Sequence, residues 1–203
     1  MASGAATSRL RTRSGWRDAY TDSLEKVAAE VRVCPLCRLS QSRTNAVPGE
    51  GPTDAELFFV GEGPGVEEDR QGRPFVGRAG QLLNEAFEAA GIRREEVFIT
   101  NVVKCRPPGN RPPLRDEADA CQPYLERQLT LVQPRVVCLL GNTAIERFLG
   151  EAKPGIRGKL FTVGGRRLFP TIHPAAAIYN PGLAKVLGIH LTRLKAELER
   201  FRG

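Results

Sequence analysis

Four short apolar runs divide the chain, and each is rich in the β-branched and aromatic residues that favour strands. Continuous apolar runs of this length are typical of parallel strands that are buried on both faces of a sheet. Pro170 lies within the fourth run and weakens that assignment, because proline donates no hydrogen bond to a ladder. We expect strands over residues 56–60, 97–103, 135–140 and 168–172.

The segments between these runs carry apolar residues at helical spacing. Leu83, Ala86 and Phe87 fall on one face of such a segment, and Gly91 is placed to end the helix. Strands that alternate with helices predict an α/β fold: a single domain with a three-layer α/β/α sandwich around a mostly parallel four-stranded sheet. We expect helices over residues 23–32, 79–90, 116–132, 143–149 and 183–201.

Four residues sit at or near the carboxyl ends of the predicted strands. Ligand sites in open parallel sheets collect at this edge, because the strand ends and the loops that follow them meet there. We therefore expect one crevice bordered by Gly61, Asn101, Gly141 and His173.

The charge of the chain adds a candidate partner. Lysine and arginine number 30 and aspartate and glutamate 23, which gives a net charge of +7. This excess favours a polyanion such as nucleic acid, although a basic protein without such a partner is the alternative. No apolar run approaches the roughly 20 residues that cross a bilayer, so no membrane association is expected.

Residues 1–16 contain three arginines and no apolar stretch after them, unlike a secretory signal. We expect a disordered basic tail over residues 1–16 and one domain over residues 17–203. The protein is expected to be a cytoplasmic monomer, and in a reducing compartment its five cysteines indicate metal binding or chemistry more than disulfides.

Four of the five cysteines form a candidate metal site. Cys34 and Cys37 make a C-x2-C pair, and Cys105 and Cys121 follow with wider spacing. Cys138 lies inside the third apolar run and is interpreted as a small buried hydrophobe. The spacing leaves an iron–sulfur cluster and a zinc ion equally open, with unligated thiols or a redox pair as further alternatives.

A glycine-rich segment follows the first strand. Its small residues let the backbone approach a ligand and turn N–H groups towards it, although a tight strand-to-helix turn is the alternative. Downstream, Phe75 stands between Pro74 and further glycines, where it is either a stacking platform for a base or an apolar plug at the sheet edge. The loop glycines are Gly61, Gly63 and Gly65.

Several of these motifs together resemble a known family. The segments GEGPGVEEDRQGRPFVGRAG, TNVVKCRPPGNR and HPAAAIYNP, with four cysteines in this order, are similar to the family 4 uracil-DNA glycosylases over about residues 31–200. The resemblance implies a base-excision repair enzyme that flips uracil out of single- or double-stranded DNA and hydrolyses its N-glycosidic bond. It also implies a four-iron four-sulfur (4Fe-4S) cluster in place of zinc, held by Cys34, Cys37, Cys105 and Cys121.

The resemblance also implies roles for single residues. Phe75 would stack on the uracil ring, and Asn101 would read the edge of the base that pairs in a duplex. His173 would donate to uracil O2 as negative charge develops there. The backbone N–H groups of the loop from Gly61 to Gly65 would add to that stabilisation.

Activation of water is the least defined part of this interpretation. Many superfamily members carry an aspartate where this chain has Gly63, so a direct carboxylate base is missing at that point. Glu62 and Glu68 are the remaining candidates, as a base or as electrostatic support for the sugar cation. For Glu68, a solvated surface position is the alternative.

Two loops are candidates for contacting DNA outside the pocket. The loop at residues 106–115 carries Arg106, Arg111 and Arg115, which suit phosphate contacts next to a cysteine ligand. The loop after His173 carries Ile178 and Tyr179, either of which would fill the stack that the base leaves.

Two other functional classes compete with the enzyme. Some superfamily relatives trap uracil-DNA covalently through a histidine in a loop after the asparagine-bearing strand, but no histidine occurs here before Cys121. A structural or electron-transfer protein would leave the grouping of Phe75, Asn101 and His173 without a purpose. The enzyme is therefore the expected class.

Overall fold

A five-stranded sheet forms the middle layer of the protein. The computed structural model describes residues 22–201. The strand order is β2-β1-β3-β5-β4; all pairings are parallel except that of β4 with β5. The strands are β1 (Leu57–Gly61), β2 (Phe98–Asn101), β3 (Val136–Leu140), β4 (Phe161–Val163) and β5 (Arg166–Thr171).

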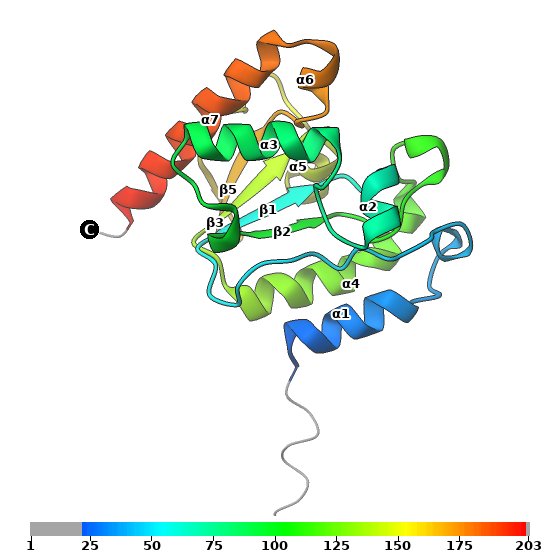
Figure 1. Ribbon diagram of the computed structural model, residues 1–203. Coiled ribbons are helices and arrows are strands. Elements are labelled where there is room, and N and C mark those ends of the chain that lie inside the picture. Colours follow the sequence, from blue (N-terminus) through cyan, green and yellow to red (C-terminus); the bar gives the residue numbers. More distant parts are fainter. Residues whose placement is uncertain (1–21, 202–203) are drawn as a thin grey trace, which may run out of the picture.

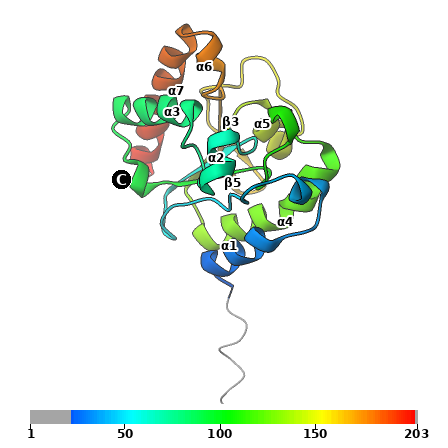
Figure 2. The same cartoon turned by 45° about the vertical axis from the view of Figure 1, so that its right-hand side comes forward.

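Helices cover both faces of this sheet. Helices α1 and α4 lie against one face and α3 and α7 against the other, as both views show (Figures 1 and 2). The predicted α/β/α sandwich is confirmed. The helices are α1 (Leu24–Val33), α2 (Val66–Gln71), α3 (Arg78–Ala89), α4 (Arg115–Val132), α5 (Asn142–Leu149), α6 (Ala176–Tyr179) and α7 (Gly182–Arg200), with short 3-10 turns η1 (Arg38–Gln41), η2 (Arg94–Glu96) and η3 (Pro108–Asn110).

Alternation along β1 distributes its side chains between two cores. Phe58 belongs to the core that includes residues of α1 and α4, and its ring stacks on Phe98 at 4.9 Å between centroids. Phe59 belongs to the core formed with α3 and α7, and its ring meets Phe87 edge-on at 4.8 Å. Cys138 is fully buried in the second core, in agreement with its interpretation as a small hydrophobe.

The sheet has one strand more than the four that the sequence pattern predicts. Strand β4 is three residues long and largely exposed, so it lacks the apolar run that marks the other strands. It forms an antiparallel hairpin with β5 through Gly164 and Gly165, whose φ angles are +56° and +79°. Two successive positive φ angles are typical of hairpin turns, so this Gly-Gly pair was the available signal.

Pro170 is tolerated within β5 because of its position relative to β4. The β4–β5 pairing involves residues 166–168 of β5 and ends before Pro170, which is aligned with Leu139 of β3 on the other side. The missing N–H therefore falls where the edge strand does not reach, and the expected fourth strand forms.

The predicted tail at residues 1–16 lies outside the described residues, and the domain boundary at residue 17 stays a prediction. Between residues 22 and 201, no helix combines the length and apolar character needed to cross a bilayer.

Candidate active site

A cavity of about 580 Å³ opens at the carboxyl edge of the sheet. Its walls come from segments that follow four different strands. Asn101, Gly141 and His173 line it, while Gly61 lies directly behind Phe75 and Asn101. The four strand-end residues that the sequence places at one crevice are therefore brought together.

Gly61 sets how closely two cavity side chains approach the end of β1. A Cβ atom built on Gly61 would lie 2.4 Å from Asn101 Oδ1 and 2.6 Å from Phe75 Cζ. Neither contact is compatible with a side chain at this position. Gly61 thus acts by leaving room for the two groups, and Gly63 and Gly65 line the cavity nearby.

Phe75 forms one wall of the cavity in an unusual backbone conformation. Its φ angle is +51°, in the left-handed region that costs a non-glycine residue about 1–3 kcal/mol. The side chain is only 5% exposed, and its ring lies 5.8 Å from the His173 ring with a tilt of 33°. The strained backbone thus presents the ring beside the imidazole.

Two polar atoms in this cavity have no hydrogen-bond partner. Among the described residues, Asn101 Oδ1 and His173 Nε2 are the buried side-chain atoms left in this condition. Leaving a buried polar group unpaired costs about 1–3 kcal/mol, so such atoms call for an explanation such as a missing ligand. Both atoms belong to side chains that line the same cavity, which indicates a polar, planar-edged ligand.

The hydrogen bonding of His173 defines which ring nitrogen is the donor. The backbone N–H of Ala175 donates to His173 Nδ1 at 3.1 Å, so in the neutral ring the proton is on Nε2. Burial lowers the pKa of His173 to about 4, although the charge of Glu68 opposes this shift. The residue is therefore a neutral donor at physiological pH.

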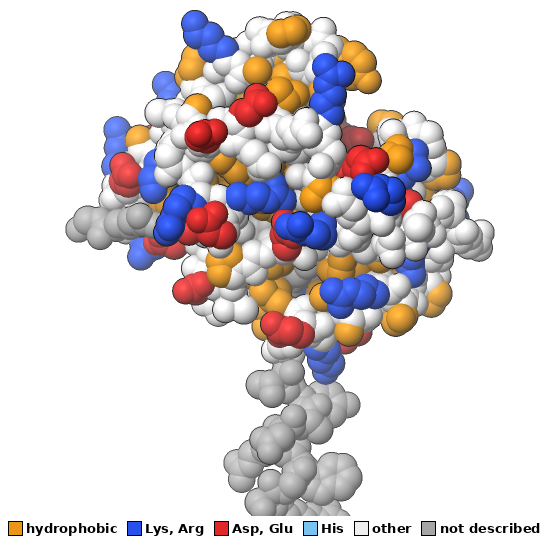
Figure 3. Space-filling view, viewed as in Figure 1, with side chains coloured by type: hydrophobic (Ala, Val, Ile, Leu, Met, Phe, Trp, Pro, Cys, Tyr) orange, Lys and Arg blue, Asp and Glu red, His pale blue; other side chains and the backbone are white. Residues whose placement is uncertain are grey.

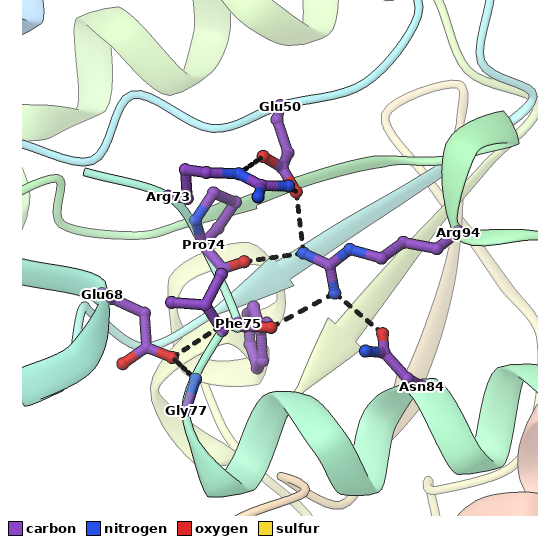
Figure 4. A network of polar contacts seen from close by, with 9 residues as sticks. Glu50, Glu68, Arg73, Pro74, Phe75, Gly77, Asn84 and Arg94 are labelled. Carbon is purple, nitrogen blue, oxygen red and sulfur yellow. Dashed lines mark hydrogen bonds and ion pairs between the residues drawn. The ribbon is translucent and has the colours of Figure 1, made fainter. Parts of the chain in front are cut away.

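Glu68 orders the backbone around the cavity. Its carboxylate accepts hydrogen bonds from the N–H groups of Gly65 (3.2 Å), Val76 (2.9 Å) and Gly77 (2.8 Å). Figure 4 shows it next to the Phe75 segment. The residue is 8% exposed, so the alternative of a solvated surface position is wrong.

Glu62 lies in the cavity wall with fewer bonds to its carboxylate. Its Oε2 accepts a hydrogen bond from the hydroxyl of Thr143 at the start of α5. Sequence reasoning missed Thr143, although its position just past Gly141 at the end of a predicted strand was an available signal.

The four predicted cysteine ligands line a second, narrow cavity. Arg43 Nη1 donates to Cys105 Sγ at 3.0 Å and to the carbonyl oxygen of Cys34 at 2.9 Å. Burial raises the pKa of the Cys105 thiol and raises that of Cys121 to about 11. Within residues 22–201, no three His, Cys, Asp or Glu side chains are arranged to hold a single metal ion.

Lys104 connects this cysteine cavity with the strand that carries Asn101. The side chain is buried, and its Nζ donates to the carbonyl oxygen of Asn101 at 2.9 Å, to Gln128 Oε1 at 2.8 Å and to Thr100 Oγ1 at 2.5 Å. Burial lowers the pKa of Lys104 to about 7, against the influence of Cys121. Lys104 thus fixes the backbone at Asn101 from the side of the cysteine cavity.

The arginines of residues 106–115 differ in their availability for DNA. Arg111 forms a two-pronged ion pair with the buried Glu117, at 2.8 Å and 2.7 Å, and it also lines the active-site cavity. Arg106 donates to Asn110 Oδ1. Arg115 has a side chain 96% exposed, and Tyr179 at the rim of the active-site cavity is 89% exposed.

Positive charge is not concentrated on one of the faces of the protein. On the face seen in Figure 3, basic and acidic side chains are interspersed, with no continuous basic region. The net positive charge alone therefore does not locate a nucleic-acid surface on this face.

Comparison with known proteins agrees with the geometry of this cavity. The sequence model of the Uracil DNA glycosylase superfamily matches residues 48–195. The chain is 51% identical to the type-4 uracil-DNA glycosylase of Sulfurisphaera tokodaii, over 82% of this chain and 80% of that protein. It is 46% identical to the enzyme of that name from Saccharolobus solfataricus, over 87% of both chains, and 48% identical to that of Thermotoga maritima, over 77% of this chain and 84% of the relative. The protein therefore belongs to the uracil-DNA glycosylase superfamily and, within it, to the type-4 uracil-DNA glycosylases.

Proposed function

We propose that the cavity at the sheet edge receives a uracil flipped out of DNA and that the protein hydrolyses its N-glycosidic bond. The product is an abasic site, as base-excision repair requires. The observation that carries this proposal is the pair of unpartnered atoms, Asn101 Oδ1 and His173 Nε2, beside the Phe75 ring. A base inside the duplex stack is out of reach, so flipping has to precede hydrolysis.

Asn101 supplies the base selectivity in this proposal. Its Oδ1 accepts a hydrogen bond from uracil N3–H, while its amide N–H group donates to O4. Cytosine has an acceptor at N3 and a donor at the next position, so it would leave both groups unpaired in a buried site. The stacking face for either base is the ring of Phe75.

His173 acts on the leaving group. Bond cleavage leaves negative charge on uracil, part of it on O2, while the sugar becomes a cation. A neutral imidazole that is already oriented by Ala175 donates from Nε2 to this oxygen without reorganisation. The proton stays on Nε2, so the residue stabilises the anion electrostatically.

The two carboxylates have separate roles in the proposal. Glu62 lines the cavity, where its carboxylate accepts a hydrogen bond from Thr143, and it stabilises the sugar cation or orients water. Glu68 is a positioning residue, since three backbone N–H groups occupy its oxygens.

We propose that the cysteine cavity holds a 4Fe-4S cluster. Cys34, Cys37, Cys105 and Cys121 supply four soft sulfur donors around one space, and Arg43 donates to one of them. When bound, the cluster supplies a rigid cross-link between the segment after α1, the segment after β2 and helix α4.

DNA outside the pocket is contacted by exposed groups. Arg106 and Arg115 are proposed to contact phosphate, and Tyr179 or Ile178 to fill the vacated stack. Action as a monomer, in the cytoplasm, and on both single- and double-stranded DNA stays a prediction.

The proposed activity is tested on an oligonucleotide with one uracil. We expect an abasic product, seen as alkali-sensitive cleavage at that position, and no cleavage of the matched cytosine strand. A stable protein–DNA adduct would instead support the trapping class. Neither product nor adduct would support a structural or electron-transfer protein.

His173→Ala and Asn101→Ala should differ in their effects. Loss of one donor to a developing anion costs about 10²–10³ in rate, so His173→Ala should lose that much single-turnover rate while uracil-DNA binding changes little. Asn101→Ala should lower the single-turnover rate and also weaken uracil-DNA binding, because Asn101 contacts the base before the bond breaks. Near-normal excision by His173→Ala would remove His173 from the catalytic residues.

The pH dependence should show no histidine step near neutrality. With a pKa of about 4, His173 is neutral above about pH 6, so the single-turnover rate should contain no histidine titration between about pH 6 and 8. The rate should fall at lower pH, when a proton on Nδ1 removes the acceptor for Ala175. His190 is the second of the two histidines in the chain. A step near pH 6.5 that persists in His190→Gln and disappears in His173→Gln would contradict the role of His173 as a neutral donor.

The purified protein should be brown, with broad absorption near about 400 nm and bound iron. Cys121→Ser should lose iron and colour. Cys138→Ser is the matched control, which should keep both while losing about 1–3 kcal/mol of stability, because its hydroxyl lies in an apolar core. A colourless protein with stoichiometric zinc would overturn the cluster proposal.

A further inference from the structure

Phe75 holds its left-handed backbone conformation because the peptide groups on both sides of it are bonded. Arg94 Nη2 donates to the carbonyl oxygen of Pro74 at 2.7 Å, and Arg94 Nη1 donates to that of Phe75 at 3.3 Å. On the opposite side, the N–H groups of Val76 and Gly77 donate to Glu68. One guanidinium and one carboxylate thus determine the orientation of both peptide planes (Figure 4).

The Arg94 guanidinium is itself held in place. Glu50 Oε1 accepts from Nη2 at 2.8 Å, and Asn84 Oδ1 accepts from Nη1 at 2.9 Å. The backbone of Glu50 is bonded to Ile99 of β2 in both directions, at 3.0 Å and 2.8 Å. The chain of contacts therefore runs from the sheet through Glu50 and Arg94 to the Phe75 backbone.

This network is shielded without being part of the cavity. The Arg94 side chain is 23% exposed and that of Glu50 is 29% exposed. Burial raises the pKa of Glu50, but its hydrogen bonds to Arg73 and Arg94 outweigh this effect and hold the pKa below its usual range. Neither Glu50 nor Arg94 lines the active-site cavity.

We propose that Arg94, held by Glu50 and Asn84, is a positioning residue that sets the uracil-stacking ring of Phe75 by clamping the carbonyl groups on either side of it. This inference rests on the proposed function and adds the group that makes the stacking platform rigid. An arginine is required because its planar fork reaches two carbonyls and a carboxylate together, whereas a lysine ammonium is a single point of charge.

The alternative is that Arg94 contributes only to stability. The two roles differ in how the Arg94 substitution combines with loss of the Phe75 ring. A positioning residue has nothing left to position in Phe75→Ala, so its effect on catalysis should vanish there. A purely structural residue should cost the same in both backgrounds.

The experiment measures single-turnover excision from a uracil oligonucleotide, inhibition by free uracil, and Tm for Arg94→Gln, Phe75→Ala and the double variant. We expect Arg94→Gln to lower the rate and weaken free-uracil inhibition on the order of tenfold in the wild-type background, and less than about twofold in the Phe75→Ala background. Arg94→Gln should lower Tm by the same amount in the wild-type and Phe75→Ala backgrounds. Arg94→Lys should recover only part of the loss.

Arg93→Gln is the matched control, because Arg93 is the neighbouring residue and it forms ion pairs with Glu95 and Glu96. It should retain the wild-type rate. If Arg94→Gln does not fold, Asn84→Ala loosens the same guanidinium more mildly and should show the same pattern. Equal rate losses in the two backgrounds would overturn the inference while leaving the function intact; absence of excision by the wild-type protein would overturn the function, and the inference with it.

Discussion

Because β1, β2, β3 and β5 run parallel, their carboxyl ends lie at one edge of the sheet, and the whole site depends on this alignment. The register pairs Gly61 directly with Asn101, so the residue that must lack a side chain is next to the one proposed to read the base. Gly141 and His173 follow the neighbouring strands. An antiparallel arrangement of the same runs would send these residues to opposite edges.

The groups that line the cavity are held in fixed positions, and holding them there costs free energy. Phe75 is held at a positive φ angle, and Asn101 Oδ1 and His173 Nε2 are buried without partners. In the proposed function, a bound uracil would satisfy both atoms and stack on the ring of Phe75. Costs of this kind are expected at sites that bind by complementarity to a charged transition state, because the donors need not reorganise during the reaction.

Different contacts support the three residues proposed to bind uracil. Lys104 fixes the carbonyl of Asn101 from the side of the cysteines, Ala175 fixes the tautomer of His173, and Arg94 with Glu68 fixes the backbone of Phe75. Each support acts on a backbone group or on a ring nitrogen. Lys104 also lines the cysteine cavity, so it connects that cavity with the residue proposed to read the base.

Local patterning in the sequence was sufficient for the four parallel strands, the main helices and the strand-end positions of Asn101 and His173, since strands buried on both faces appear as continuous apolar runs. The short β4 carried no such run, and only its Gly-Gly turn marked it. Some of the cavity's supports are local, such as the contacts of Lys104 with Asn101 and of Ala175 with His173, but the support from Arg94 was decided by tertiary structure. Arg94 and Glu50 are 44 residues apart in sequence, and each has the pattern of an ordinary surface charge. Charged side chains show no periodic pattern that reveals a distant partner, because their pairing depends on which segments the folded sheet brings together.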